Sequence, residues 1–537
     1  MEVYTFGLSR LSRVILLFCF FVASMAYADS TLTYCSEGSP DTFNPQRSLS
    51  GTTRNATART IYDRLVDFKL GTTDIIPSLA VSWEISKDHT KYRFKLRKGV
   101  QFQSTDYFKP TRELTADDVV FSITRQLNPQ HPYHLIGGGA YQYFQGVGMN
   151  HLIHAVDKID DFTVEITLNK PDATFLANLA MPFMSVLSAE YAANLLKAGK
   201  PDQLDQLPIG TGPFAFKRYV KDSTIRYVAH ENYWRGQPKI NNLVFSITPD
   251  ASVRYQKLKK NECQMIVYPA PSDLALIRKN KNLRLLALDE MNIGYLALNT
   301  EKKPLNNVLV RRAIAHALNK KFYIRAIYMG NAQVAINPYP PTMWSYTDDV
   351  TTYDYDPKKA KALLAEAGYP EGFTLSLWTL PVTRPFNPNG IKMGVLMQQD
   401  LAKVGIKVNL SAYDWGTYLD KIKRGEHEMA QLGWTGDNGN PDNFLYTLLS
   451  CDSVTRGSNN SRYCQKEFND LIIKARRVSG KPLRTALYQQ ALNQLSQDVP
   501  IIPIAHSKVF RGMSTQVRGY VMDPLDMDNF FDLSLDG

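Results

Sequence analysis

Strand and helix patterns alternate through the C-terminal half of this chain. Strict alternation of apolar and polar side chains predicts strands, and a repeat of three to four residues predicts helices. The predicted order is strand 373–379, helix 390–404, strand 406–410, helix 418–423 and strand 429–433. Strands that alternate with helices favour α/β lobes whose sheets are partly parallel, because a crossover helix returns the chain between parallel strands.

The length of the chain excludes a single hydrophobic core. It has 537 residues, whereas single cores stop growing near ~250–300 residues, so we expect two or three domains. Hydrophobic residues make up 44% and charged residues 21% of the sequence, which is typical of soluble globular proteins. The net charge is +11, but no run of five basic residues occurs. We therefore expect a solvated basic surface and no nucleic-acid partner.

The first 28 residues have the pattern of a signal peptide. Arg10 and Arg13 precede an apolar run, 14–22, that is too short to span a bilayer. The small residues Ala26 and Ala28 predict cleavage after Ala28. Phe18 stands before Cys19, where a lipidated cysteine would need a small residue. No later stretch is apolar enough to cross a membrane, so we expect an exported, periplasmic protein.

Four cysteines remain after cleavage, namely Cys35, Cys263, Cys451 and Cys464. An even number of cysteines in an exported protein indicates disulfides, and three pairings are possible. Cys451 and Cys464 are close in sequence and are expected to close a small loop, which leaves Cys35 with Cys263. A zinc site is disfavoured because the chain has no Cys-x-x-Cys pair. We expect neither a metal nor a cofactor.

The N-terminal half also contains both kinds of element. Residues 31–36 and 92–97 alternate as strands, and 164–168 forms a further alternating strand. Ala56 to Leu65 is predicted as a helix, because Ile61 and Leu65 share one face.

Two strand ends present charged residues. The strand 429–433 leads into Gly433–Asn443, a loop with three glycines, a proline and the carboxylates Asp437 and Asp442. The strand 373–379 leads to Arg384, between two prolines. Ligands of α/β proteins collect beyond the C-terminal ends of strands, so Asp437 and Arg384 could face one cleft. Taken alone, Asp437 is typical of a turn, Arg384 of a surface charge, and Asp442 of a helix cap.

Longer runs of sequence carry a family resemblance. The runs in question are Leu79–Glu84, Tyr92–Val100, Leu114–Phe121, Gly210–Phe214 and Val310–Ala313. They resemble family 5 extracellular solute-binding proteins over essentially the whole mature chain. The runs Tyr34–Pro40, Phe245–Tyr255 and Gly433–Asn443 are most similar to the dipeptide-binding members that serve bacterial ABC importers.

The resemblance implies an α/β, two-lobed periplasmic-binding-protein fold of type II with an extra domain inserted in lobe one. The implied boundaries are 29–290 with 508–537 for lobe one, 61–184 for the inserted domain and 291–507 for lobe two. The family pattern supports the two expected disulfides. It also implies a monomer that binds a dipeptide and delivers it to an inner-membrane ABC permease complex.

The same resemblance implies the roles of individual residues. Asp437 would bind the α-ammonium group of a peptide and Arg384 its terminal carboxylate. The implied pocket-wall or backbone contacts are Ser50, Tyr141, Trp415, Trp434 and Thr435. Two departures from the family pattern, Asn440 in place of an acidic residue and Leu49 in place of a small polar one, would tune the ligand preference.

Two charged groups of opposite sign suit a free dipeptide. Two residues extend at most ~7 Å, so a fixed carboxylate and a fixed guanidinium would select length as well as charge. Arginine suits a carboxylate because its planar guanidinium can bind both oxygens.

Other functions have weaker support in the sequence. The motifs of serine hydrolases, zinc proteases and P-loop enzymes do not occur, so we expect a binding protein and not an enzyme. A calcium loop from Asn438 to Leu449 lacks the glycine and the final glutamate that it needs. Haem, glutathione or antimicrobial peptides remain alternative ligands on the same fold. Spacing of His131 with His134, and of His151 with His154, would suit metal binding, although exposed or capping histidines are the favoured interpretation.

Overall fold

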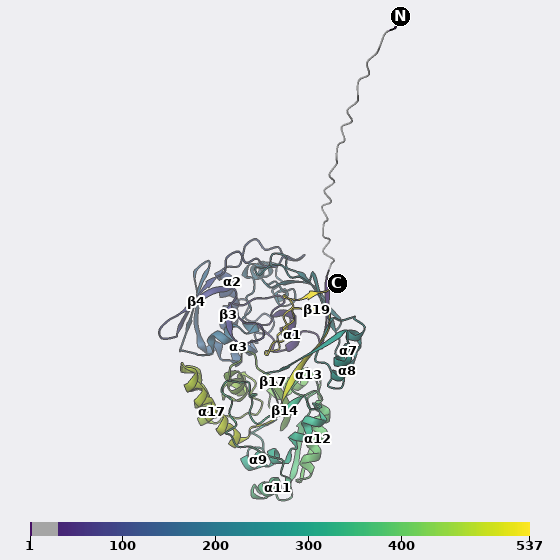
Figure 1. Ribbon diagram of the computed structural model, residues 1–537. Coiled ribbons are helices and arrows are strands. Elements are labelled where there is room, and N and C mark those ends of the chain that lie inside the picture. The colour runs from purple at the N-terminus through teal and green to yellow at the C-terminus, as the bar shows by residue number, and fades with distance from the viewer. Residues whose placement is uncertain (3–29, 537) are drawn as a thin grey trace.

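The protein consists of two lobes stacked end to end. The computed structural model describes residues 1–2 and 30–536. The predicted signal peptide and its cleavage site after Ala28 lie outside these residues. In Figure 1 the purple and blue N-terminal elements form the upper lobe, lobe one, and helices α9, α11, α12 and α17 lie in the lower lobe, lobe two. Within the described residues, no helix combines the length and the apolar character needed to cross a bilayer.

One twelve-stranded sheet runs through both lobes, in the order β16-β15-β17-β13-β18-β11-β1-β10-β9-β8, with β12 and β14 also paired to β18. Its lobe-one strands are β1 (Thr31–Ser36), β8 (Phe214–Val220), β9 (Thr224–Ala229), β10 (Asn242–Ile247), β11 (Met265–Val267) and β12 (Leu283–Asp289). Its lobe-two strands are β13 (Asn292–Leu298), β14 (Ala332–Val334), β15 (Phe373–Trp378), β16 (Ile406–Ser411) and β17 (Met429–Thr435). The pairs β1–β10, β1–β11, β15–β16 and β15–β17 are parallel, which confirms the predicted partly parallel α/β sheet.

Helices cover both faces of the sheet in lobe two. One face packs on α9 (Val308–Ala317), α10 (Lys320–Ala326), α11 (Pro357–Glu366) and α12 (Gly390–Ala402). The other packs on α13 (Trp415–Lys423), α14 (Asp442–Leu449), α16 (Lys466–Arg477) and α17 (Lys481–Asp498), with the short α15 (Ser453–Arg456) beside α14. A strand with both faces covered is mostly apolar, and β13 is buried at every position, with the amide side chain of Asn292 hydrogen-bonded to Ser507.

The strand β18 (Ile501–Ser514) joins the two lobes. Its first half pairs with β13 and β14 of lobe two, and from Lys508 onward it pairs with β12 and β11 of lobe one. The change of partner falls between Ser507 and Lys508. The chain crosses a second time between Asp289, at the end of β12, and Asn292, at the start of β13. The lobe boundaries in the sequence stay a prediction; one crossing falls within β18 and the other falls between the end of β12 and the start of β13.

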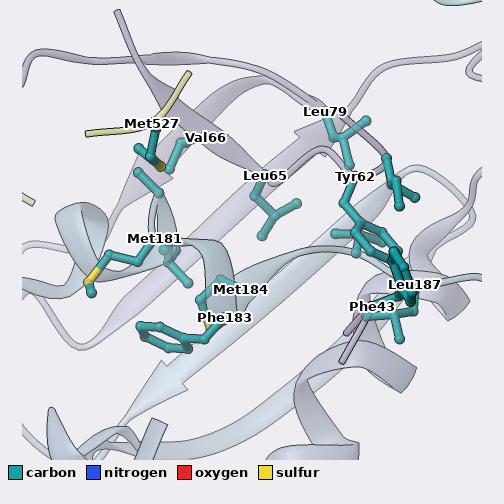
Figure 2. Close-up of a cluster of buried hydrophobic side chains, with 14 of the residues drawn as sticks. Phe43, Tyr62, Leu65, Val66, Leu79, Met181, Phe183, Met184, Leu187 and Met527 are labelled. Carbon is teal, nitrogen blue, oxygen red and sulfur yellow. The ribbon is translucent and has the colours of Figure 1, made fainter. Parts of the chain in front are cut away.

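Lobe one contains a second, separate sheet. It is antiparallel, has the order β4-β5-β7-β6 and comprises β4 (Ala80–Ile85), β5 (Lys91–Leu96), β6 (Ile153–Asp160) and β7 (Thr163–Leu168). The helix α2 (Ala116–Leu127) contacts β6 and β7. All of these elements lie within the expected inserted segment, 61–184. Their core is continuous with that of the main sheet of lobe one, and Figure 2 shows part of it, where Leu79 and Met181 lie with Phe43 and Met527.

Shorter elements complete lobe one. Its remaining helices are α1 (Gly51–Thr57), α3 (Gln142–Gly146), α4 (Met149–Leu152), α5 (Phe175–Leu179), α6 (Ala189–Lys197), α7 (Ala251–Lys259) and α8 (Leu274–Lys279), with 3-10 turns η1 (Pro182–Met184) and η2 (Pro201–Asp205). Two small ladders pair β2 (Val66–Phe68) with β3 (Ile75–Pro77) and β19 (Val517–Arg518) with β20 (Ser534–Leu535).

The predicted helix from Ala56 to Leu65 is wrong. The observed helix, α1, begins at Gly51 and ends at Thr57. The carbonyl groups of Thr60 and Ile61 accept hydrogen bonds from the distant N–H groups of Phe214 (2.9 Å) and Gly212 (2.8 Å). Because these carbonyls bind another segment, they cannot continue the helical hydrogen-bond pattern. The earlier start places Ser50 and Arg54 on the first turns of the helix.

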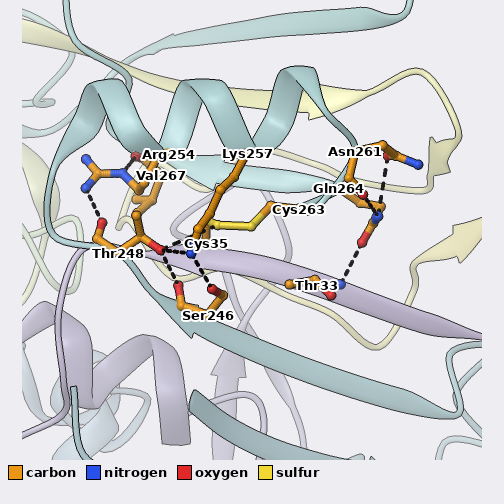
Figure 3. The surroundings of a disulfide bond; sticks show 10 residues. All are labelled: Thr33, Cys35, Ser246, Thr248, Arg254, Lys257, Asn261, Cys263, Gln264 and Val267. Carbon is orange, nitrogen blue, oxygen red and sulfur yellow. Dashed lines mark hydrogen bonds between the residues drawn. A yellow bond between two sulfur atoms is a disulfide. The ribbon is translucent and has the colours of Figure 1, made fainter. Parts of the chain in front are cut away.

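Both expected disulfides are present. Cys35 on β1 is bonded to Cys263, which follows α7, and Cys451 is bonded to Cys464. Figure 3 shows the first bond beneath α7, where Lys257 donates to the hydroxyl groups of Ser246 (3.1 Å) and Thr248 (2.9 Å). Cys35 and Cys263 are both fully buried, so this bond is part of a small core of its own.

The two disulfides should stabilise the fold to different extents. Cys35–Cys263 closes a loop with a sequence separation of 228, against 13 for Cys451–Cys464. The chain-entropy relation then predicts a loss of about 5 kcal/mol for Cys35→Ala/Cys263→Ala and about 3 kcal/mol for Cys451→Ala/Cys464→Ala. Denaturant unfolding of the two double variants measures the difference. Equal losses would show that loop length does not govern the contribution of these bonds.

Candidate functional site

A cavity of about 420 Å³ lies between the two lobes, and both supply its walls. Lobe one contributes the segment around α1 and part of the inserted segment, and lobe two contributes the ends of β15 and β17. Of the predicted site residues, six line this cavity, namely Ser50, Arg384, Trp415, Trp434, Thr435 and Asp437.

Asp437 lies in the loop that follows β17. Its side chain is buried, with 3% of its surface exposed. The Asn443 side chain accepts hydrogen bonds from the backbone N–H of Asp437 (3.0 Å) and from the indole N–H of Trp434 (3.0 Å). Asn443 belongs to α14, so the helix holds the loop against the end of the strand. A buried carboxylate fixed in this way is available to a cation that enters the cavity.

The Asp437 carboxylate has two partners from lobe one. Arg54 on α1 donates to its Oδ1 (3.0 Å), and the Tyr143 hydroxyl on α3 donates to its Oδ2. Burial raises the pKa of Asp437 above its usual range, while Arg54, Tyr143 and Asn443 act in the opposite direction. The two donors therefore offset part of the cost of burying this charge.

Arg384 lies beyond the end of β15, in a tight turn whose backbone N–H groups pair Arg384 with Asn387 (3.2 and 3.0 Å). Its guanidinium lies over the ring of Trp415, 5.6 Å from the ring centre. None of the ion pairs in the described parts of the chain involves Arg384. It also borders a second, smaller cavity of about 120 Å³. A guanidinium that has no carboxylate partner is available to an anion.

Tyr141 is placed differently from the expectation. It is fully buried away from the cavity, and its hydroxyl donates to the backbone carbonyls of Tyr133 (3.3 Å) and His134 (3.1 Å). Tyr143, two residues later, lines the cavity instead. Tyr141 is the N-cap of α3, with a non-helical backbone, whereas Tyr143 lies within the helix, so the two side chains point to different sides.

The two departures from the family pattern also differ in position. Leu49 lines the cavity and is 36% exposed, so it can contact a ligand. Asn440 is buried outside the cavity lining and accepts a hydrogen bond from Arg484 of α17 (3.0 Å). Its role is to hold the loop on lobe two.

The sequence did not point to three further residues that line the cavity, namely Arg54, Tyr143 and Asp526. Arg54 and Asp437 are 383 residues apart, and Tyr143 and Asp437 are 294 apart. No local pattern signals such pairings. The unused clue was that a carboxylate expected to be buried needs a cationic partner.

The metal alternatives find no support in the described ranges, 1–2 and 30–536. These residues contain no group of three or more His, Cys, Asp and Glu side chains that could hold a metal ion. In the proposed calcium loop, Asn438 donates instead to Asn178 of lobe one (2.9 Å). The His134 ring is buried and its Nδ1 contacts the carbonyl of Arg125 (2.9 Å).

The expected role of Asp442 as a helix cap is wrong: Asp442 is the first residue of α14, the cap position is Pro441, and no side chain of the described residues caps the helix. Asp442 is 3% exposed and lies 3.6 Å from the Nε of Arg476 on α16, which is also 3.2 Å from Asp172 of lobe one. Burial raises the pKa of Asp442 to about 6, while Arg476 lowers it and Asp172 raises it. Asp442 is absent from the cavity lining and contributes to the contact between the lobes.

Comparison with known proteins places the chain in a family. The model for "Bacterial extracellular solute-binding proteins, family 5 Middle" matches residues 74–456. This chain belongs to the family 5 bacterial extracellular solute-binding proteins.

Individual relatives share nearly the full length. The chain is 52% identical to the dipeptide-binding protein of Escherichia coli K12, over 94% of this chain and 95% of the relative. It is 48% identical to haem-binding protein A of Haemophilus influenzae, over 95% and 93%. Among solved structures, it is similar to the dipeptide-binding protein from Pseudoalteromonas sp. SM9913 in complex with Met-Leu, with a TM-score of 0.90 and 37% identity over 94% of this chain and 100% of that one.

The buried Asp442 should make stability depend on pH. The pKa of about 6 in the folded protein exceeds the value near 3.9 of an unfolded chain, so the folded state retains this proton over a wider pH range. Stability from this group is present below about pH 4 and is lost as the pH rises through about 6. Relative to Asp442→Asn, the wild type should lose about 3 kcal/mol between these limits. Urea unfolding of both proteins at a series of pH values tests this, and a constant difference would contradict it.

Proposed function

We propose that this protein is the periplasmic substrate-binding component of an ABC peptide importer. In this proposal it is a monomer that binds free dipeptides between its two lobes and delivers them to an inner-membrane permease complex. It binds its ligand without chemical conversion. The relatives named above support the ligand class, since one is a dipeptide-binding protein and one was solved with Met-Leu.

One observation supports this function above the others: Asp437 and Arg384 line the same cavity. They have opposite charges and come from the ends of two neighbouring strands, β17 and β15, of one sheet. A dipeptide zwitterion carries an ammonium group and a carboxylate separated by at most ~7 Å of chain. Asp437 would bind the ammonium group, and Arg384 would bind the carboxylate in a bidentate manner.

Both charged groups make the site selective for free termini. Acetylation of the amine would remove the ligand cation from the buried Asp437, and amidation would remove the anion from the half-exposed Arg384, each at a cost of roughly 1–3 kcal/mol. A longer peptide would have to extend past Arg384 or Asp437. The cavity therefore favours a short ligand with both ends free.

The other residues that line the cavity suit dipeptides with different side chains. Trp415, Trp434 and Tyr143 offer flat apolar surfaces, and Ser50 and Thr435 add hydroxyl groups. A cavity of about 420 Å³ is large enough for a dipeptide together with ordered water, within the usual range of small-ligand sites. Water can fill the space that a small side chain leaves, so affinity depends mainly on the charged termini.

Haem is the second candidate ligand, because one relative is a haem-binding protein. Of the residues described in the structure, no His, Cys or Met lines the cavity. The side chains that most often bind haem iron are thus absent from this wall. Titration with haemin, followed by absorbance in the presence and absence of a dipeptide, tests this candidate. Haem binding that a dipeptide displaces would place both ligands in one site.

Removal of either charged group should weaken dipeptide binding. We expect Asp437→Asn and Arg384→Ala each to raise the Kd for Ala-Leu at least about tenfold, which corresponds to ~1.4 kcal/mol. In Asp437→Asn the N-acetylated dipeptide should bind no worse than the free one, and in Arg384→Ala the same should hold for the amidated dipeptide. Isothermal titration calorimetry measures all of these affinities.

A matched control is Asp470→Asn, which removes a carboxylate from an exposed ion pair with Lys466 on α16. This variant should bind like the wild type. Unchanged affinity in both site variants would refute the two-charge model.

A further inference from the structure

Five charged side chains form a continuous chain beneath the cavity, and their signs alternate. The Arg54 guanidinium donates to Asp437 (Nη1–Oδ1, 3.0 Å) and to Asp526 (Nη2–Oδ2, 3.1 Å). Arg511 donates to Asp526 (Nη2–Oδ1, 2.6 Å) and to Asp528 (Nε–Oδ1, 3.0 Å). The side chain of Arg54 is 13% exposed and the other four are 4% exposed or less. We call these five residues the charge chain.

The charge chain crosses between the lobes. Asp437 belongs to lobe two, in the loop after β17. Arg54 lies on α1, Arg511 on β18, and Asp526 and Asp528 lie in the C-terminal segment that packs on lobe one. Arg54 is the member that joins the two lobes, because its two nitrogens bind carboxylates on opposite sides of the cleft.

The charges within the charge chain do not balance. Three carboxylates face two guanidinium groups, which leaves one negative charge. Asp528 at the far end is enclosed by the hydroxyl groups of Tyr34 (2.8 Å) and Tyr520 (2.5 Å), and Asp526 already contacts two guanidinium groups. Asp437 is therefore the place where a further cation completes the alternation. A buried charge imbalance is unfavourable until it is neutralised.

We propose that Arg54 is a positioning residue for the peptide ammonium group: it bridges Asp526 to Asp437 across the cleft and holds the Asp437 carboxylate ionised and oriented toward the cavity. This inference rests on the proposed function, because it assumes that Asp437 binds an ammonium group. A peptide amine would then become the last positive member of the charge chain, and its binding would be coupled to the contact between the lobes.

The electrostatics of Asp437 agree with this role. Burial raises its pKa, and Arg54 is the largest influence that lowers it. Without Arg54, the pKa of the Asp437 carboxyl group would rise further, and a smaller fraction of it would be ionised when the amine enters. The pKa of Arg54 is itself held above its ordinary value by Asp526 and Asp437, although burial opposes this. A guanidinium suits the position because its two terminal nitrogens can bind two carboxylates at once.

Other titratable groups face the same region. Tyr143 contacts Asp437 directly, and the charged groups on the cavity wall also include Glu37, Asp41, Arg47 and Arg384. Arg47 is paired with Asp205 (2.8 Å). Burial and Asp526 raise the pKa of Glu290 to about 8, so at neutral pH this carboxyl group is mostly protonated and adds little charge.

The test is the selectivity of Arg54→Met for a free amine. The ratio of the Kd for N-acetyl-Ala-Leu to the Kd for Ala-Leu measures how much the site gains from the ammonium group. We expect Arg54→Met to lower this ratio at least about tenfold, and Arg54→Lys to lower it less. A purely structural role of Arg54 would weaken both peptides equally and leave the ratio unchanged.

Proton counting gives a second, independent measurement. Calorimetry at pH 6.5 in two buffers of different ionisation enthalpy counts the protons released when Ala-Leu binds. If Arg54 holds Asp437 ionised as proposed, the wild type should release few protons. Arg54→Met should release more, because the incoming ammonium group drives a proton off Asp437. If Arg54→Met releases as many protons as the wild type and its ratio of the two Kd values is unchanged, the proposal is refuted.

Arg59→Met is the matched control. Arg59 lies five residues after Arg54 and forms a buried pair with Asp523 (2.5 Å), but it does not line the cavity. Arg59→Met should lose about as much stability as Arg54→Met but should keep the wild-type ratio of the two Kd values. Arg54→Gln is a second neutral variant should Arg54→Met fold poorly, since Asp526 keeps its contact with Arg511 in both.

Asp437→Asn distinguishes a failure of the proposed function from a failure of the proposed role of Arg54. If the wild type shows no preference for the free amine, and Asp437→Asn binds like the wild type, the proposed function fails. If Asp437→Asn loses the preference but Arg54→Met keeps it, the proposed function holds and the role of Arg54 is refuted. If Asp437→Asn and Arg54→Met both lose the preference for the free amine, the double variant that combines them should lose no more of this preference than either single variant, because Arg54 acts through Asp437.

Discussion

The continuity of β18 through both lobes is the constraint on which the rest of the structure depends. This one strand pairs with lobe-two strands in its first half and with lobe-one strands in its second half. The lobes are thus two ends of a single sheet, and the cavity of about 420 Å³ lies between them. Its lining residues come from both lobes. A change in the angle between the lobes would therefore alter the cavity directly, which is the usual basis of ligand capture by closure.

The charges of the site are distributed unevenly around this junction. The carboxylate end is buried and belongs to an ordered chain of ion pairs, whereas Arg384 is partly exposed and rests on the ring of Trp415. The two ends of a peptide would therefore meet different environments. Under the proposed function, an amine would join a preformed network of buried ion pairs, while a carboxylate would meet a partly exposed side chain. This difference would favour a fixed N-terminus and allow variation near the C-terminus.

Long-range contacts account for the features that sequence patterns did not reveal. The helix from Ala56 to Leu65 was mispredicted because the carbonyls of its second half bind a loop about 150 residues away in sequence. Tyr141 was expected in the pocket wall, but Tyr143 lies there instead, because the backbone at the start of α3 decides which ring faces the cavity. Arg54 was missed because its partners are 383 and 472 residues away. Each error has the same cause, namely that tertiary contacts override local preference.

The sequence by itself determined the class of the fold, the bounds of the five elements predicted between 373 and 433 to within three residues, the two disulfides and the family. These follow from periodicity, spacing and extended similarity, which are local or cumulative properties of the chain. It also identified Asp437 and Arg384 as the charged residues at two strand ends. Only the tertiary structure decided that both line one cavity, and that Asp437 is held by Arg54 and Tyr143 of the other lobe. Those contacts join segments hundreds of residues apart, and the packing of the lobes around β18 sets their geometry.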